Sequence, residues 1–157
     1  MKLSRPVQYV IASIVFINIF VLAYLWTLPT SIPSEQAPSV SCDFTQGACV
    51  NQFNLDGQTI HITLNLSPGE LPIAKPLTVE ANVNGYPFQS AEIDISGINM
   101  YMGYNRQPLK KISVGTLTGE TLLAFCTEQK MTWKATLILH QKKQSLEVPF
   151  EFKTVRN

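Results

Sequence analysis

The sequence has little of what enzymes require. Its 157 residues include only two histidines, His61 and His140, and the sequence identifies no partner for either. It contains no nucleophile motif such as GxSxG and no zinc motif such as HExxH, and its eight glycines form no phosphate-binding loop. We therefore expect no catalytic residues, no enzyme activity and no small-molecule substrate.

Charge is also sparse, and neither sign dominates. Lysine and arginine together number 12, aspartate and glutamate number 11, and the formal net charge is +1. Proteins that bind nucleic acid usually carry a basic patch or stripe, and this sequence has neither such a patch nor an acidic tail. We therefore expect no nucleic-acid partner.

One long stretch lacks charge altogether, from Val7 to Leu28. As a helix rising ~1.5 Å per residue it would be roughly 33 Å long, which is enough to cross a hydrocarbon core of about 30 Å. Lys2 and Arg5 are the only charged residues before it, so the positive-inside rule keeps residues 1–6 in the cytoplasm and exports the rest. A cleaved signal peptide is the alternative, but residues 25–28, LWTL, are bulky where a peptidase requires small side chains. The sequence predicts an uncleaved single-pass signal anchor at 7–28, in a bacterial inner membrane.

The stretch that follows has the composition of a tether. Residues 29–40, PTSIPSEQAPSV, contain three prolines and no apolar period, which is typical of an extended, semi-rigid linker. The remaining residues, 41–157, are close to the common size of a domain and can build one core. We expect them to form a single periplasmic domain.

Beyond the tether, apolar residues alternate with polar ones in short runs, and no run has a helical period. The clearest run is Gln58–Leu66, QTIHITLNL, with isoleucine and leucine on one face. Pro149 cannot donate to a neighbouring strand, so we expect the last strand to lie at an edge or to carry a bulge. Short strands separated by turns predict a mainly β fold, an immunoglobulin-like antiparallel β-sandwich, with a small barrel as the alternative. The predicted strands cover residues 58–66, 77–83, 91–95, 111–117, 120–125, 131–139 and 146–152.

Three cysteines leave at least one without a partner inside the chain. In an oxidising compartment a disulfide is the expected state. The loop-entropy model gives roughly 2.5 kcal/mol for a Cys42–Cys49 bridge and roughly 4.5 kcal/mol for a bridge from either residue to Cys126. The short bridge forms more readily because its ends are already close. We expect Cys42–Cys49, with Cys126 a buried free thiol or a metal ligand, and keep the long bridge as the alternative.

Soft metal donors gather in the second half of the domain. Met100 and Met102 are two residues apart, so in an extended chain both thioethers point the same way, and Cys126 and Met131 follow downstream. Thioether and thiolate ligands select Cu(I). This clustering motivates the hypothesis of a copper site formed by Met100, Met102, Cys126 and Met131.

Two other interpretations of the same residues stay open. Methionine fills irregular gaps in cores, and Met131 has the apolar parity of Trp133, so it can be a core residue. Alternatively, the methionines and their aromatic neighbours form a loop that contacts a partner protein. The residues expected to make that contact are Tyr101, Tyr104, Asn105 and Arg106.

The segment 98–103, INMYMG, is followed by a hairpin and then by residues 131–137, MTWKATL. This arrangement resembles the second half of the YtkA-like and FixH-like proteins, small membrane-anchored periplasmic β-sandwiches. The resemblance implies a role in copper handling or in the assembly of respiratory oxidases. Only Met100 and Met102 match the methionine-containing loop of those proteins, and Trp133 matches their core tryptophan. The loop here contains no histidine, which argues against Cu(II).

These features together predict a non-enzymatic, membrane-anchored accessory protein of the periplasm. In the first hypothesis it binds Cu(I) and assists a respiratory or other membrane complex. In the second it is a metal-free, disulfide-stapled interaction module of the cell envelope that uses the loop 97–106.

Overall fold

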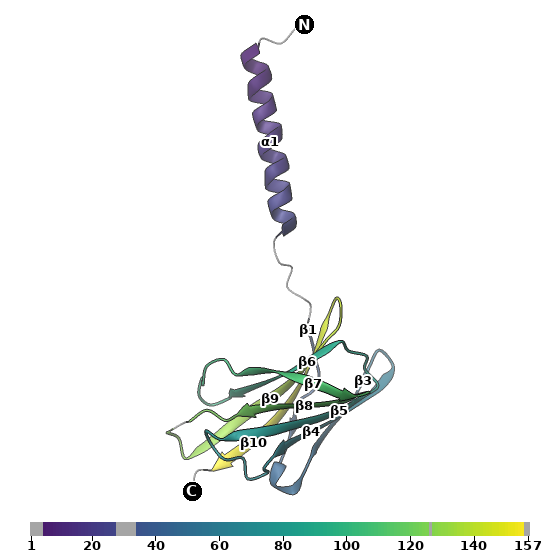
Figure 1. Cartoon of the computed structure of the whole chain (residues 1–157), viewed down its shortest axis with the longest axis vertical. Coiled ribbons are helices and arrows are strands. Elements are labelled where there is room, and N and C mark those ends of the chain that lie inside the picture. The colour runs from purple at the N-terminus through teal and green to yellow at the C-terminus, as the bar shows by residue number, and fades with distance from the viewer. Residues whose placement is uncertain (1–4, 28–33, 126, 156–157) are drawn as a thin grey trace. The chain divides into compact units, whose positions relative to one another are not determined.

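The computed structural model describes residues 5–27, 34–125 and 127–155; within the helix it describes the side chains of Tyr9 and residues 13–24. These residues form two compact units: a helix, α1 (Arg5–Thr27), and a β-rich part that we call the β unit, residues 34–155 (Figure 1). Within the described part of the chain, no helix is both long and apolar enough to cross a membrane.

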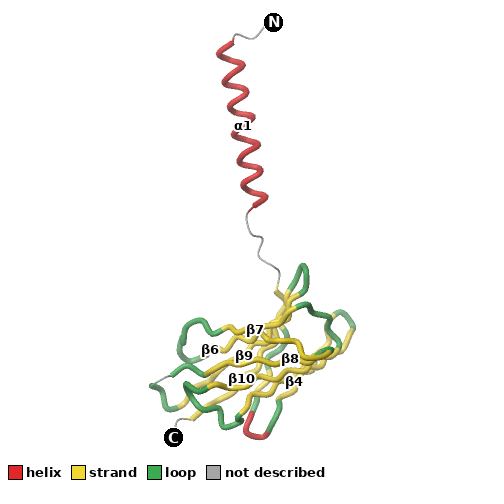
Figure 2. Tube along the Cα trace, in the orientation of Figure 1, coloured by secondary structure: helices red, strands yellow, loops and turns green. Residues whose placement is uncertain are grey.

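The β unit is built almost entirely of strands, as the alternating sequence pattern predicts (Figure 2). The one helix described in the β unit is a short 3-10 helix, η1 (Phe44–Gln46), which lies between the second and third strands. The strands are β1 (Ser34–Gln36), β2 (Val40–Ser41), β3 (Cys49–Leu55), β4 (Gln58–Ser67), β5 (Pro76–Asn84), β6 (Ser90–Gly97), β7 (Arg106–Ser113), β8 (Thr116–Leu122), β9 (Lys130–His140) and β10 (Ser145–Val155).

All ten strands belong to one curled sheet. Its order is β1-β10-β9-β6-β7-β8-β5-β4-β3, with β2 also paired to β10. The first half of β7 pairs with β6 and its second half pairs with β8, so this strand passes from one half of the sheet to the other. Most neighbours are antiparallel, and only β1 and β2 run parallel to their partner. The mainly β prediction is confirmed.

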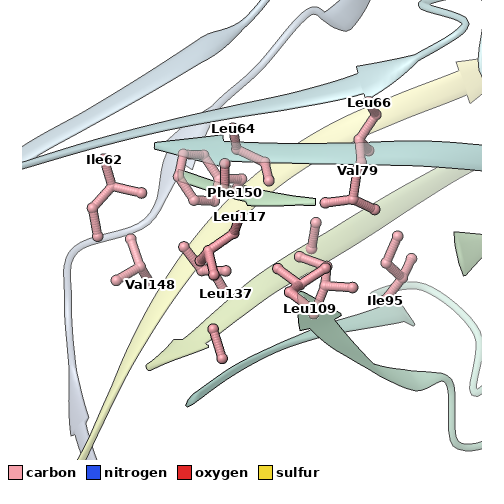
Figure 3. Close-up of a cluster of buried hydrophobic side chains, with 14 of the residues drawn as sticks. Ile62, Leu64, Leu66, Val79, Ile95, Leu109, Leu117, Leu137, Val148 and Phe150 are labelled. Atoms are coloured by element: carbon pink, nitrogen blue, oxygen red, sulfur yellow. The ribbon is translucent and has the colours of Figure 1, made fainter. Parts of the chain in front are cut away.

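The inner faces of the two halves meet in a continuous apolar core. Side chains of β4, β5 and β8 face those of β6, β9 and β10, and Figure 3 labels ten side chains of this core, including Leu109 of β7. Trp133, at 1% exposure, packs among them and donates its indole N–H to the Thr154 hydroxyl at 2.8 Å. This bond satisfies the only polar atom of the indole, which is why the ring can be buried completely.

The start of the β unit falls within the residues expected to form the tether. β1 and β2 add in parallel to one side of β10, and both begin before the expected domain start at Ser41. The N–H groups of Ala37 and Cys42 donate to the carbonyls of Glu147 and Glu151, so these carbonyls face β1 and β2. Backbone groups two residues apart along a strand point to the same side, so the nitrogen of Pro149 faces that side too.

The position of Pro149 therefore explains the break between β1 and β2. β1 pairs with residues 145–147 and β2 with residues 150–151, which leaves the proline nitrogen without a strand opposite it. The expectation of an edge strand is wrong around Pro149, because β10 has neighbours on both sides over residues 145–147 and 150–151. The lack of an N–H at Pro149 is accommodated because the neighbouring segment is interrupted there, between β1 and β2.

Two contacts join the segment around β2 to the opposite edge strand of the sheet, β3. Cys42 and Cys49 form a disulfide, which confirms the short bridge expected from the sequence. Asn51 on β3 is fully buried and donates from its amide nitrogen to the Pro38 carbonyl at 2.8 Å. The covalent bond and the hydrogen bond together hold the first segment of the β unit against β3.

The predicted strands 111–117 and 120–125 have the wrong bounds, and β3 was not predicted. The run 111–117 does not form one strand, because β7 ends at Ser113 and β8 begins at Thr116. Gly115 between them has φ +76°, a conformation that favours glycine, and Val114 is 95% exposed at the tip of the turn. The gap expected at residues 118–119, between the predicted strands 111–117 and 120–125, lies instead inside β8. A Cβ on Gly119 would collide there with Leu109. That glycine allows two strands to approach closely and does not mark a turn.

Candidate functional site

The loop between β6 and β7, residues 98–105, is fastened to β9 by its first residues. Ile98 N–H donates to the Thr132 carbonyl at 2.8 Å, which extends the β6–β9 pairing by one residue. The Asn99 side chain accepts from the Thr132 N–H at 3.0 Å and donates to the Lys130 carbonyl at 3.4 Å. The side-chain amide of Asn99 thus makes the hydrogen bonds to β9 that the main chain of a paired strand would make. These bonds fix the direction in which the loop leaves the sheet.

The other end of the loop is fixed by Asn105. Its carbonyl accepts from the Ile95 N–H at 3.0 Å, and its side chain donates to the Leu122 carbonyl at 2.7 Å. The loop therefore bridges β6 and the end of β8. Hydrogen bonds at both ends reduce the conformational entropy that the loop can lose on binding.

Large apolar and aromatic side chains of this loop face solvent. Tyr101 is 88% exposed and Tyr104 is 78% exposed, while Ile98 and Met100 are 50% and 38% exposed. The neighbouring β8–β9 connection starts beside Asn105 and ends beside Asn99, so it lies at the same end of the β unit. Leu122 at the end of β8 and Phe125 in this connection are also exposed. We call the exposed apolar residues of this region the loop surface: Ile98, Met100, Tyr101, Tyr104, Leu122 and Phe125.

The predicted metal ligands are only partly brought together. Met131 is buried at 1% exposure, in agreement with its apolar parity, and Met102 packs against the core. A Cβ on Gly97 would lie 3.0 Å from Met102 Cγ and 3.0 Å from Met131 Cε, so both thioether side chains converge on this glycine. Met100 is half exposed, and Cys126 lies outside the described residues. Among the described residues, no three or more His, Cys, Asp and Glu side chains are grouped as metal ligands.

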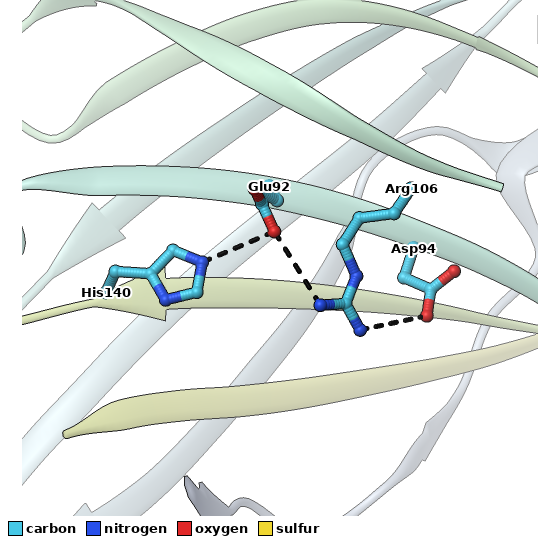
Figure 4. A network of polar contacts seen from close by, with 4 residues as sticks. All are labelled: Glu92, Asp94, Arg106 and His140. Atoms are coloured by element: carbon cyan, nitrogen blue, oxygen red, sulfur yellow. Dashed lines mark hydrogen bonds and ion pairs between the residues drawn. The ribbon is translucent and has the colours of Figure 1, made fainter. Parts of the chain in front are cut away.

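Arg106 lies at the start of β7 and pairs with carboxylates on the neighbouring strand. Its guanidinium nitrogens are 3.8 Å from Glu92 Oε2 and 3.5 Å from Asp94 Oδ2, while His140 Nε2 is 3.3 Å from the same Glu92 oxygen (Figure 4). Arg106 also reaches Tyr104, with Cζ 5.5 Å from the ring centroid. The charge network thus extends to the edge of the loop surface.

Sequence reasoning did not anticipate this network. It identified no partner for His140 and assigned Arg106 to the exposed loop. The alternation of β6 does place Glu92 and Asp94 on its polar face, but only the sheet register brings β7 and β9 against that face. The side chains are about one-quarter to one-third exposed, at 26–34%, so solvent screens the pairs.

Comparison with known proteins finds no matching family model, no matching curated protein and no matching solved structure. The resemblance to the YtkA-like and FixH-like proteins therefore stays a prediction.

Proposed function

We propose that this protein is a non-enzymatic, membrane-anchored interaction module of the bacterial cell envelope, and that the loop surface contacts a membrane-protein partner. The observation that carries the proposal is the exposure of Tyr101 and Tyr104 on a loop whose two ends are fastened by Asn99 and Asn105. Tyrosine, methionine and arginine are enriched at protein interfaces, and contiguous exposed apolar groups mark such sites. A loop that is fixed at both ends loses less entropy on binding than a free one.

The anchor is part of the same proposal and rests on the sequence and on α1. Residues 7–28 carry no charge. The described apolar side chains of α1 occupy consecutive positions, so they surround the helix, and all are about half or more exposed in the isolated chain. A helix that is apolar on every side requires lipid or protein around it. Lys2 and Arg5 orient it with the N-terminus in the cytoplasm and the β unit in the periplasm.

An immunoglobulin-like sandwich is the fold that we propose for the β unit in preference to a small barrel. Support comes from the order β10-β9-β6 in one half and β4-β5-β8 in the other, with inner faces packed on each other. Strand β7 passes between the halves, and strands that switch sheets form the corners of some packed sheets. In such a sandwich the loop surface would lie at one end, where interaction loops of this fold cluster, and this supports the proposed contact.

Site-specific photocrosslinking in membranes tests the proposed contact. A photoreactive phenylalanine analogue replaces Tyr101 in one variant and Val114 in the other. Val114 is a matched control because it is 95% exposed but follows the opposite end of β7. We expect a discrete adduct from position 101 and none from position 114. Equal adducts from both positions, or none from 101, would show that the loop surface is not a binding site.

Copper binding is a second candidate function, favoured by the convergence of Met102 and Met131 on Gly97. Two thioethers are a soft donor pair, and Met100 or Cys126 would have to complete the ligand set. A Met100→Leu/Met102→Leu double variant nearly preserves volume while removing the donors. We expect Cu(I), titrated against a competing chelator, to be retained by the original protein and lost by the variant. If the variant retains Cu(I) equally, the methionines are not the ligands.

A further inference from the structure

One side of β10 is covered along only part of its length. β1 pairs with residues 145–147 and β2 with residues 150–151, and the chain leaves after Cys42. Among the described residues, no strand pairs with residues 152–155 on that side, whereas β9 pairs with them on the other. The last four residues of β10, near the end marked C in Figure 1, therefore form an open strand edge.

The neighbouring hydrogen bonds fix which main-chain groups face this edge. The carbonyls of Glu147 and Glu151 accept bonds from that side, so the N–H and C=O groups of Lys153 and Val155 face it as well. The partner strand agrees, because the Thr132 carbonyl opposite Lys153 points away from β10 and accepts from Ile98. Lys153 and Val155 thus present two donors and two acceptors with the spacing of a strand.

A groove runs beside this open edge. It has a volume of about 460 Å³ and separates residues 152–155 from the segment 69–73 and from η1. Its apolar lining includes Phe44, Leu71 and Phe152, and the rings of Phe44 and Phe152 meet edge to face at 5.3 Å. A groove of this size beside main-chain groups matches what strand addition needs, since main-chain bonds supply affinity and the pocket supplies selectivity.

The charges at the groove are mainly acidic. Asp43 and Glu70 line it and are exposed, and Lys153 is the only described cation among its lining residues. Hydrogen bonds from the Thr45 hydroxyl and N–H lower the pKa of Asp43, so its carboxylate is charged at neutral pH. A basic side chain of a bound ligand would therefore complement the negative charge of Asp43 and Glu70.

We propose that the open edge of β10 binds an extended peptide segment of a partner protein by strand addition. The peptide would pair with Lys153 and Val155, continuing the line already occupied by β1 and β2. It would place an apolar side chain in the groove and a basic one near Asp43 and Glu70. This second contact depends neither on the membrane anchor nor on the loop surface.

Proline substitution can remove the edge donor without touching the β9 ladder. The N–H of Lys153 faces the open side, as does the nitrogen of Pro149 four residues earlier in the same strand. Lys153→Pro therefore deletes a donor and places a ring where the peptide would lie. Lys153→Ala is the matched control, because it removes the same side chain but keeps the N–H.

The test uses the purified full chain in detergent as bait for a phage-displayed library of random linear heptapeptides, with counter-selection on Lys153→Pro. We expect enriched peptides that alternate apolar residues and carry a basic one. An enriched synthetic peptide should lose at least about tenfold in affinity, measured by fluorescence anisotropy, against Lys153→Pro. Its affinity for Lys153→Ala should stay within about twofold. No enriched peptide, or equal binding to both variants, would overturn the proposal.

Amide hydrogen exchange keeps the proposal testable if Lys153→Pro does not fold. In the unaltered chain the Lys153 and Val155 amides should exchange rapidly and become protected when the selected peptide is bound. Unchanged exchange at both amides would contradict strand addition at this edge. If the chain instead forms a dimer that shows this protection without any peptide, the occupant is a second copy and a partner peptide is excluded.

Discussion

Loss of the Cys42–Cys49 disulfide should destabilise the β unit by an amount that can be estimated in advance. The two cysteines are separated by 7 positions, so the bridge closes a loop of about eight residues. In the chain-entropy model such a loop contributes about 2.5 kcal/mol at 25 °C, mainly by restricting the unfolded chain. For a domain of about 120 residues this corresponds to a fall of about 10 °C in Tm.

The assay compares thermal unfolding of Cys42→Ser/Cys49→Ser with that of Cys126→Ser, both followed by circular dichroism. Cys126→Ser leaves the bridge intact and controls for the removal of a thiol. Reducing agent should shift the Tm of the control toward that of the double variant and leave the double variant unchanged. A fall of less than about 3 °C would refute the chain-entropy reasoning, because the folded segment would then be held equally well without the bond.

The hydrogen bond between Asn51 and the Pro38 carbonyl provides a second test of how firmly the segment around β2 is held. Asn51 holds it through the bond to the Pro38 carbonyl, and the Asn51 amide is fully buried. Asn51→Ala should cost about 1–3 kcal/mol with the disulfide present, since it also leaves a carbonyl unpaired. If both contacts hold one unit, the cost without the disulfide should be smaller, because the segment has already been released. Additive costs would show that the two contacts act independently.

Three further predictions follow from single side chains. Gly97→Ala should destabilise the β unit by about 1–3 kcal/mol in urea unfolding and reduce crosslinking from the loop, because a Cβ collides with the loop methionines; unchanged stability would mean that the loop yields freely. Trp133→Phe should cost about 1–3 kcal/mol in the same assay, since it leaves the buried Thr154 hydroxyl without its donor, and a loss below about 0.5 kcal/mol would contradict this. The lowered pKa of Asp43 means that its carboxylate stabilises the fold above its ordinary value of 3.8, and this contribution disappears as pH falls through the folded-state pKa. Asp43→Asn should therefore flatten the fall in Tm between neutral and acid pH, and an unchanged profile would refute the role of this carboxylate.

Some of the candidate site could be found from residue order, and some could not. The exposed aromatic and methionine residues of 98–105 are contiguous in the sequence, so their loop was visible as a pattern. Glu92, Arg106 and His140 come from three strands, and nothing in their sequence spacing indicates that β7 and β9 flank β6. The same is true of the groove beside β10, whose walls are about 80 residues apart in the chain.

The sequence by itself determined the β character of the domain and its short disulfide. Alternation along β4, β5, β6, β9 and β10 has a period of two whatever the neighbours are, and a seven-residue separation keeps two cysteines close even in an open chain. Only the tertiary structure decided what individual glycines and prolines do in the sheet. Gly119 allows close strand contact while Gly115 makes the turn, and the gap at Pro149 depends on which side its nitrogen faces. Those outcomes depend on sheet register, which residues distant in the sequence fix through their packing.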